Sequence, residues 1–203
     1  MEEKRIKIIE PFEIELKPID THGFILDIGG GGAGMIGKLN GRQVIAIDIK
    51  EEELLETENE ALKIVMDARK LQFLPESFDV CTAFFTFMYI KNEDHHKVFR
   101  EINRVLKRDG RFLLWDVVIP ERREDYDIFA VHLRIKFKNK TLEEGYGVKW
   151  DKTQDMNHFK ELAEETSFDI IKEWQRDEIF YLEMIKILSG DDKEIGGKDE
   201  ENR

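Results

Sequence analysis

The chain has 203 residues, of which 41% are hydrophobic and 37% charged, so it can bury one full core but is too short for two ordinary domains. No apolar run approaches the roughly 20 residues that cross a bilayer, and the charged N-terminus does not resemble a signal peptide. The single cysteine, Cys81, excludes an intrachain disulfide and a cysteine metal cluster. We therefore expect a cytoplasmic protein with no metal site and no membrane segment.

The formal net charge is −12. An acidic surface repels the phosphate backbone of nucleic acids, so nucleic acid is not expected as a partner. The one local exception is a run of basic residues between positions 132 and 140, which is considered below.

Apolar runs alternate with helical segments through the first part of the chain, which is typical of a parallel sheet wrapped by helices. Strands are predicted at 24–27, 44–48, 62–67, 78–85 and 111–118. The clearest helix follows the fourth strand: Asn92 can cap it, and Val98, Phe99, Ile102, Val105 and Leu106 form one apolar stripe. A turn at Asp109 and Gly110 then leads into the fifth strand.

After residue 118 the pattern changes. Strands at 128–137 and 142–150 predict a β-hairpin around Asn139 and Lys140, followed by a helix that Thr153 caps. Strands at 168–174 and 179–188 are separated by a short turn, so they should pair antiparallel. The prediction is one domain over 1–188 with a hairpin insertion at 119–150, and a charged, disordered tail at 189–203.

A glycine cluster follows the first strand directly. Glycines are needed there because the chain must turn tightly and let a ligand approach the bare backbone. Asp48 ends the second strand, where a carboxylate can accept hydrogen bonds from both hydroxyls of a ribose. The two features together predict a ribonucleoside cofactor.

The identity of that cofactor depends on the acids around the cluster. Gly29, Gly31 and Gly34 also satisfy the G-x-G-x-x-G spacing of a dinucleotide site. Asp27, however, would repel a pyrophosphate and hold the ammonium of a methionine moiety. Asp67, at the end of the third strand, offers an acceptor for an adenine amino group.

With these residues, the sequence resembles the class I S-adenosylmethionine-dependent methyltransferases, in the ubiquinone/menaquinone-biosynthesis-like (methyltransferase type 11) group. The matching stretches are 25–34, 45–48, 65–68, 74–79 and 105–114. The resemblance implies an α/β, Rossmann-like fold. Its seven-stranded, mostly parallel sheet has an antiparallel terminal strand and helices on both faces, and an extra β-hairpin lies near 126–150.

The resemblance also implies a set of cofactor-binding residues. They are Asp27, Gly29, Gly30 and Gly31 for the methionine part, Asp48 and Ile49 for the ribose side, Asp67 and Ala68 for adenine, and Phe84 and Phe85 beside the sulfonium. Other interpretations stay open, because acids at strand ends are often caps and phenylalanines are often core. The sequence departs from the family pattern at two places. Ala33 stands where a loop glycine is usual, and the turn at 108–110 stands where Pro-Gly-Gly is usual. Neither departure removes a side chain that the chemistry requires.

Methyl transfer needs alignment more than acid or base help, so no catalytic signature is expected. Candidate acceptor-side residues are Asp116, Tyr89, His132, Tyr146 and Trp150, with Asp116 preferred because it ends the fifth strand; a strand-end cap is the alternative. His95 and His96 are expected to be solvated. The segment 82–86 lacks the Asn/Asp-Pro-Pro-aromatic motif of enzymes that methylate nucleobase amino groups.

The hairpin has one basic and one apolar face, because successive strand residues point to opposite sides. The basic residues are His132, Arg134, Lys136, Lys138 and Lys140, and the apolar ones are Phe129, Val131, Leu133, Ile135 and Phe137. One interpretation is a solvated basic face protecting an edge strand. The other is a lid, or an arm of a homodimer through 126–150, that presents basic groups to an anionic acceptor.

The sequence therefore predicts S-adenosylmethionine-dependent methyl transfer to a small-molecule acceptor by direct in-line displacement. An alternative is a regulatory module that binds S-adenosylmethionine or S-adenosylhomocysteine without turnover. An NAD-dependent oxidoreductase is the third hypothesis.

Overall fold

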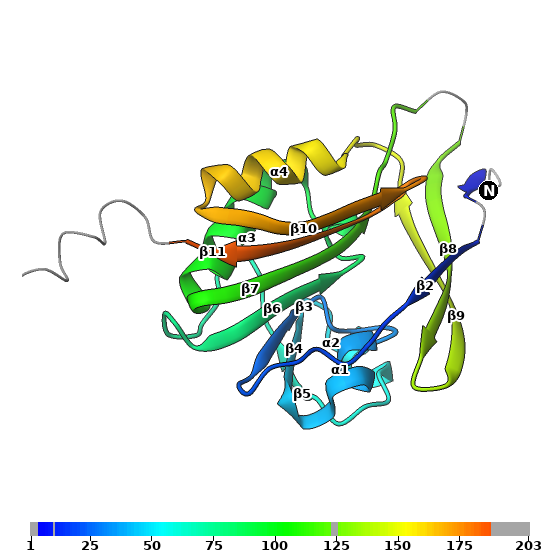
Figure 1. Ribbon diagram of the computed structural model, residues 1–203. Helices are drawn as coiled ribbons and strands as arrows, with labels where there is room; N and C mark the ends of the chain where they lie inside the picture. The colour runs from blue at the N-terminus through cyan, green and yellow to red at the C-terminus, as the bar shows by residue number, and fades with distance from the viewer. Residues whose placement is uncertain (1–3, 10, 123–125, 188–203) are drawn as a thin grey trace, which may run out of the picture.

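The computed structural model describes residues 4–9, 11–122 and 126–187, so the predicted tail at 189–203 lies outside the described residues. The larger of two sheets has seven strands in the order β10-β11-β7-β6-β3-β4-β5 (Figure 1). In chain order these are β3 (Ile25–Ile28), β4 (Val44–Asp48), β5 (Leu62–Val65), β6 (Phe78–Phe84), β7 (Leu106–Val117), β10 (Phe168–Arg176) and β11 (Ile179–Lys186).

Pairing in the larger sheet is parallel from β5 to β7, whereas β11 is antiparallel to both β7 and β10. This confirms the predicted mostly parallel sheet with an antiparallel end. Strand β3 lies between β4 and β6, so the strand order reverses there. Open α/β sheets bind ligands at such a reversal, beside the carboxyl ends of the strands.

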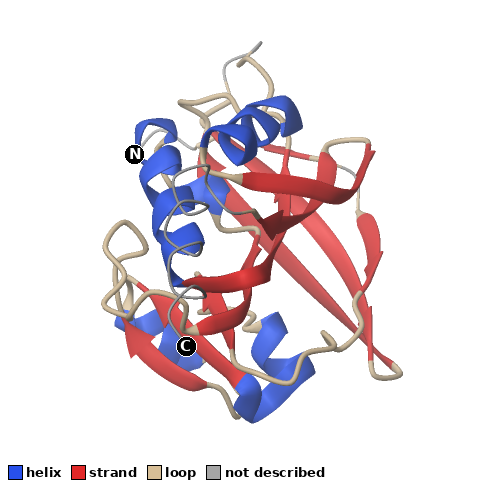
Figure 2. Ribbon diagram, turned by 60° about the vertical axis from the view of Figure 1, so that its left-hand side comes forward, coloured by secondary structure: helices blue, strands red, loops and turns tan. Residues whose placement is uncertain are grey.

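Four helices cover the larger sheet: α1 (Met35–Asn40), α2 (Glu51–Glu56), α3 (Asn92–Val105) and α4 (Met156–Glu165). Helices α3 and α4 lie side by side and bury Phe99 and Phe159 against one face of the sheet (Figure 2). Helices α1 and α2 belong to the hydrophobic cluster on the other face, through Ile36 and Leu54. Within the described residues, no helix is long and apolar enough to cross a membrane.

A second sheet, here called the small sheet, contains β1 (Ile6–Ile8), β2 (Phe12–Glu15), β8 (Ile128–Phe137) and β9 (Lys140–Lys149). Strand β9 pairs antiparallel with one edge of β8, and β1 and β2 pair parallel, one after the other, with the opposite edge. The small sheet stands beside the carboxyl ends of the larger sheet's strands (Figure 1).

The hairpin prediction is confirmed, but its interpretation as an edge strand is wrong. Strand β8 is paired on both sides because β1 and β2 occupy its second edge. These two strands escaped prediction because they are only 3 and 4 residues long, and all three residues of β1 are exposed. Hydrophobic alternation is too brief in such segments to be recognised.

Three other local predictions are wrong. Helix α3 begins at Asn92 itself, and the Asn92 amide donates to the Thr153 carbonyl at 2.7 Å instead of capping the helix. Helix α4 is capped by Asp155, whose carboxylate accepts from the His158 amide at 2.8 Å. The expected turn at 109–110 lies inside β7, which begins at Leu106 and passes through Asp109 with a φ of 56°.

The prediction for the two adjacent histidines is only half right. His95 is fully buried, with its ring packed on Phe87 and Phe159. His96 is partly exposed, 3.9 Å from Glu165. His95 points inward because it lies one turn before Phe99 on the apolar stripe of α3.

Candidate cofactor and acceptor site

The glycine loop (residues 29–34) joins β3 to α1, and its close neighbours explain why it has so few side chains. A Cβ on Gly30 would lie 2.7 Å from an oxygen of Asp27, and a Cβ on Gly31 would lie 2.9 Å from Asp48 Oδ2. The bare backbone of the loop therefore lies directly against the two carboxylates that end β3 and β4. The structure thus brings together the predicted residues of the methionine and ribose sides.

Asp27 lies beneath the loop and not at its open mouth. It is 2% exposed, and Oδ1 accepts a 2.8 Å hydrogen bond from the Thr82 hydroxyl. Burial raises the pKa of Asp27 to about 7; the Thr82 hydrogen bond opposes this rise and the negative charge of Asp48 adds to it. A carboxyl of this kind is poised to ionise when a cation approaches.

Asp48 and Ile49 lie where β4 ends. Asp48 Oδ1 accepts from the Lys50 amide at 2.9 Å, which fixes the carboxylate beside the glycine loop. Ile49 is 62% exposed, an unusual environment for an isoleucine that adjoins a polar site. An oriented carboxylate next to an exposed apolar side chain fits the ribose hydroxyls and the apolar face of a nucleoside base.

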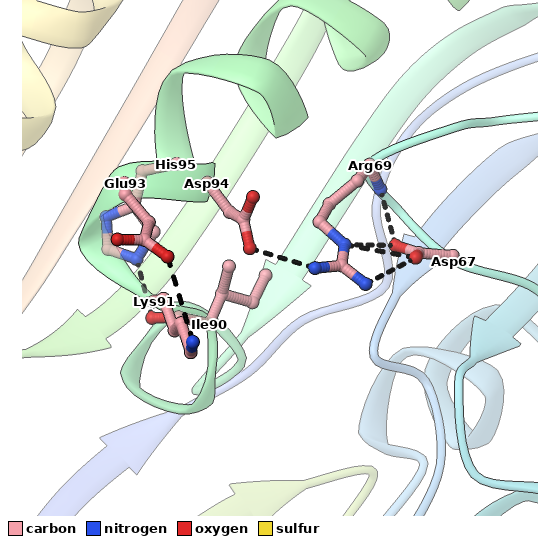
Figure 3. Close-up of polar contacts among 7 residues, drawn as sticks. All are labelled: Asp67, Arg69, Ile90, Lys91, Glu93, Asp94 and His95. Carbon is pink, nitrogen blue, oxygen red and sulfur yellow. Dashed lines mark hydrogen bonds and ion pairs between the residues drawn. The ribbon is translucent and has the colours of Figure 1, made fainter.

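Asp67, the predicted adenine acceptor, is held by a neighbouring arginine (Figure 3). The Arg69 guanidinium donates to both Asp67 oxygens at 2.8–3.0 Å and also to Asp94 at 3.0 Å. The Arg69 hydrogen bonds hold the pKa of Asp67 below its usual range. The amide of Arg69 also donates to Asp67 Oδ1 at 2.9 Å, so Asp67 caps the following turn; its contact with adenine, like that of Ala68, stays a prediction.

The segment after β6 (residues 85–90) lies opposite the glycine loop. A Cβ on Gly29 would lie 2.4 Å from Thr86, so this segment packs directly on the loop. Phe84 and Phe85 are buried, and Phe85 has a left-handed φ of 52°. Tyr146 of β9 stacks on Phe85 with ring centroids 5.1 Å apart. The small sheet therefore reaches the predicted sulfonium side of the site.

A second contact joins the small sheet to the same segment. The amide of Gly147 donates to the Tyr89 hydroxyl at 3.2 Å. Burial of its hydroxyl raises the pKa of Tyr89 to about 12, although the side chain as a whole is about half exposed. Two of the five acceptor-side candidates, Tyr89 and Tyr146, thus lie where the small sheet meets the segment after β6.

Asp116 is buried and fully engaged. One oxygen accepts from the Phe87 amide at 2.8 Å, and the other accepts from the Val117 amide at 2.9 Å and the Gln154 side chain at 2.7 Å. Burial raises its pKa to about 6. In this geometry Asp116 ties the segment after β6 to β7, as the alternative interpretation of a strand-end cap proposed.

A polar cluster that the sequence did not predict holds the segment after β6 through two of its carbonyl groups. Lys152 donates to the carbonyls of Phe87 and Ile90 at 2.8 and 2.6 Å. His95 Nε2 lies 3.2 and 3.0 Å from the same two carbonyl oxygens, so Nε2 is the nitrogen that carries the proton. The other ring nitrogen of His95, Nδ1, lies 2.9 Å from His158 Nε2. Burial, and then the charge of Lys152, lowers the pKa of His95 to about 4. No motif links these residues, because they come from separate elements.

The remaining acceptor-side candidates lie elsewhere. His132 is on the outer face of β8, 3.6 Å from Glu143. Trp150 is buried in the small sheet, and its indole nitrogen donates to the Pro120 carbonyl at 2.9 Å. The structure therefore does not bring either side chain to Tyr89 and Tyr146.

Comparison with known proteins finds similar sequences for part of the chain. Residues 26–114 match a family model described as a methyltransferase domain. A sterol 4-C-methyltransferase from Caenorhabditis elegans is 31% identical over 105 residues, which are 52% of this chain and 30% of that protein. A demethylmenaquinone methyltransferase from Thermotoga maritima is 32% identical over 119 residues, which are 54% of this chain and 51% of that protein. The chain thus spans about half or less of the length of these relatives.

Solved structures show the same fold. An S-adenosylmethionine-dependent methyltransferase from Methanosarcina mazei has a TM-score of 0.61 at 17% identity, with 85% of this chain and 96% of that chain covered. A phosphoethanolamine N-methyltransferase 2 from Haemonchus contortus, in complex with S-adenosyl-L-methionine, has a TM-score of 0.58 at 18% identity, with 84% and 50% covered. At such identities the likeness concerns the fold alone.

Proposed function

We propose that this chain transfers a methyl group from S-adenosylmethionine to a small-molecule acceptor, because residues 26–114 match a family model described as a methyltransferase domain. The observation that carries the proposal is the arrangement at the reversal of strand order, where the bare glycine loop, the Asp48 carboxylate and the exposed Ile49 lie together. This set fits an adenosyl group better than a pyrophosphate, because buried Asp27 lies beneath the loop.

The residues present suggest how the cofactor would be held. Asp48 would accept hydrogen bonds from the ribose hydroxyls, Ile49 would cover the base, and the glycine loop would border the methionine part. When bound, S-adenosylmethionine supplies a methyl group on a sulfonium that is already an activated leaving group. The aromatic rings of Phe85 and Tyr146 exclude water and offer π faces that favour a cation.

The contribution of the chain to the chemistry is then mainly alignment, and we propose direct in-line displacement. Holding two reactants in a productive geometry can supply roughly 7–11 kcal/mol of the barrier. Asp116 contributes by fixing the segment after β6, because both its oxygens are already occupied. Tyr89 and Tyr146 are the residues placed to contact the acceptor. The acceptors in the names of relatives are a sterol, demethylmenaquinone and phosphoethanolamine, all small molecules.

The test is a pair of measurements on the wild-type protein. Calorimetric titrations of S-adenosylmethionine, S-adenosylhomocysteine and NAD should show micromolar binding of the sulfur nucleosides alone. A labelled methyl group should then pass from S-adenosylmethionine to a member of a small-molecule panel. Binding without transfer to any acceptor would favour the regulatory module, and binding of NAD alone would overturn the proposal.

A further inference from the structure

The face of the small sheet that points toward the larger sheet, here called the inner face, contains one acidic residue. Directly opposite residues of an antiparallel pair share a face. Glu144 lies opposite Leu133, between the pairs Leu142 with Ile135 and Tyr146 with Val131. Leu133, Ile135 and Val131 are buried in the core. A carboxylate thus lies among the apolar residues of this part of the inner face, whereas Lys140 is at its far end, opposite Phe137.

Glu144 has no partner for its charge. Its side chain is half-buried, and among the residues that the structure describes it makes neither a hydrogen bond nor an ion pair. Its neighbour Glu143, on the outer face, lies 3.1 Å from Arg134 and 3.6 Å from His132. A carboxylate that is partly removed from water without a partner costs stability. Such violations of the hydrophobic pattern are expected at functional sites.

The position of Glu144 follows from the contacts on either side of it. At the hairpin turn, Lys138 donates to the Lys38 carbonyl in α1 at 2.9 Å. Farther along β9, Tyr146 stacks on Phe85 of the segment after β6. Glu144 lies between these two anchor points, two residues from Tyr146 and on the same face, so it lies on the side of the small sheet that contacts the segment after β6.

We propose that Glu144 recognises the methyl acceptor and that the acceptor carries a cationic nitrogen; this rests on the proposed function. A carboxylate makes its strongest hydrogen bonds with charged donors, and the aromatic rings of Tyr146 and Phe85 beside it also favour a cation. Of the predicted basic face, only His132, Arg134 and Lys136 lie on the outer face, where Arg134 pairs with Glu143. Lys138 lies in the turn, and Lys140 is opposite Phe137 at the far end of the hairpin, because the turn changes the alternation. The part of the inner face beside Tyr146 is therefore suited to a cation and not to the anionic acceptor that the basic run suggested.

The experiment compares a cationic probe with its neutral counterpart of similar shape. Benzylamine and benzyl alcohol are titrated by calorimetry at pH 7 into protein saturated with S-adenosylhomocysteine. Wild type should bind benzylamine about tenfold more tightly, because a hydrogen bond to a charged group contributes more than a neutral one. Glu144→Gln should abolish this preference. The matched control Glu143→Gln, its neighbour on the outer face, should keep it.

The titration of S-adenosylhomocysteine separates this inference from the proposed function. If wild type does not bind S-adenosylhomocysteine, the proposed function fails and the inference fails with it. If S-adenosylhomocysteine binds but benzylamine is not preferred, or Glu144→Gln keeps the preference, the inference alone is overturned. An equal loss of S-adenosylhomocysteine affinity in Glu144→Gln would assign Glu144 to the cofactor, which also overturns it.

Discussion

The two sheets use their polar residues in opposite ways. In the larger sheet, two acids near strand ends are buried and partnered: Asp27 with Thr82, and Asp116 with amides on both sides. In the small sheet, the partnered charges lie on the outer face, and among the described residues Glu144 on the inner face makes neither a hydrogen bond nor an ion pair. The larger sheet thus holds the predicted cofactor-binding residues, whereas the small sheet brings Tyr146 against the segment after β6. We expect cofactor binding to depend on the first and choice of acceptor on the second.

The largest expected effect tests the partnered acids. Asp116→Ala should lower the free energy of unfolding by about 3 kcal/mol, because it leaves buried donors at Phe87 and Gln154 unpaired. The control, Asp169→Ala on the exposed side of β10, should stay within about 0.5 kcal/mol. Denaturant unfolding gives both values. An Asp116→Ala protein that keeps wild-type stability but loses methyl transfer would contradict the positioning role and restore Asp116 as a reacting group.

An intermediate effect concerns pH. Burial raises the pKa of folded Asp27 from 3.8 to about 7, so between these values the folded state binds the proton and the unfolded state releases it. The contribution of Asp27 to stability is therefore full below about pH 4 and is lost as the pH rises through 7. Asp27→Asn cannot ionise, so its melting temperature relative to wild type should rise across this window.

A second variant sharpens the pH experiment. The Thr82 hydroxyl stabilises the ionised form of Asp27, so Thr82→Val should move the midpoint of this effect to higher pH. Thermal unfolding between pH 4 and 8 measures both variants. A difference between Asp27→Asn and wild type that does not change with pH would show that Asp27 is not the buried, perturbed acid described above.

The smallest effect is expected on the outer face of the small sheet. Arg134 and Lys136 are about half exposed and pair across strands with Glu143 and Glu13 at 3.1 and 2.7 Å. Exposed ion pairs of this kind contribute about 0–1 kcal/mol. Arg134→Ala and Lys136→Ala should therefore change stability little and leave acceptor affinity unchanged. A clear loss of acceptor affinity in either variant would favour the basic-lid hypothesis. It would also contradict the claim that the inner face of the small sheet, and not the outer face, contacts the acceptor.

The central strands of the larger sheet could be predicted from the sequence because they are apolar runs bounded by glycine or acidic residues. Continuous runs such as Ile25–Ile28 and Val44–Asp48 indicate strands buried on both faces, and the glycines between them require a tight turn. The same patterns placed Asp27 and Asp48 together, which the structure confirms as neighbours of the loop.

The rest depended on contacts that no local pattern encodes. Strands β1 and β2 form because β8 offers them an edge more than 110 residues away in sequence. Lys152, His95 and His158 meet only once α3 and α4 have packed together. Glu144 could have been found, because it breaks the apolar alternation of its strand. That signal has meaning only when this face of the small sheet is known to contact the segment after β6.

The central claim is that the glycine loop and the ends of β3 and β4 bind an adenosyl cofactor through Asp48. Calorimetric titration of S-adenosylhomocysteine into wild type and Asp48→Ala tests it most directly. The account predicts micromolar affinity for wild type and a loss of about a hundredfold in the variant, because two charge-assisted hydrogen bonds to the ribose would be removed. Equal affinity in the two proteins, or binding to neither, would contradict it.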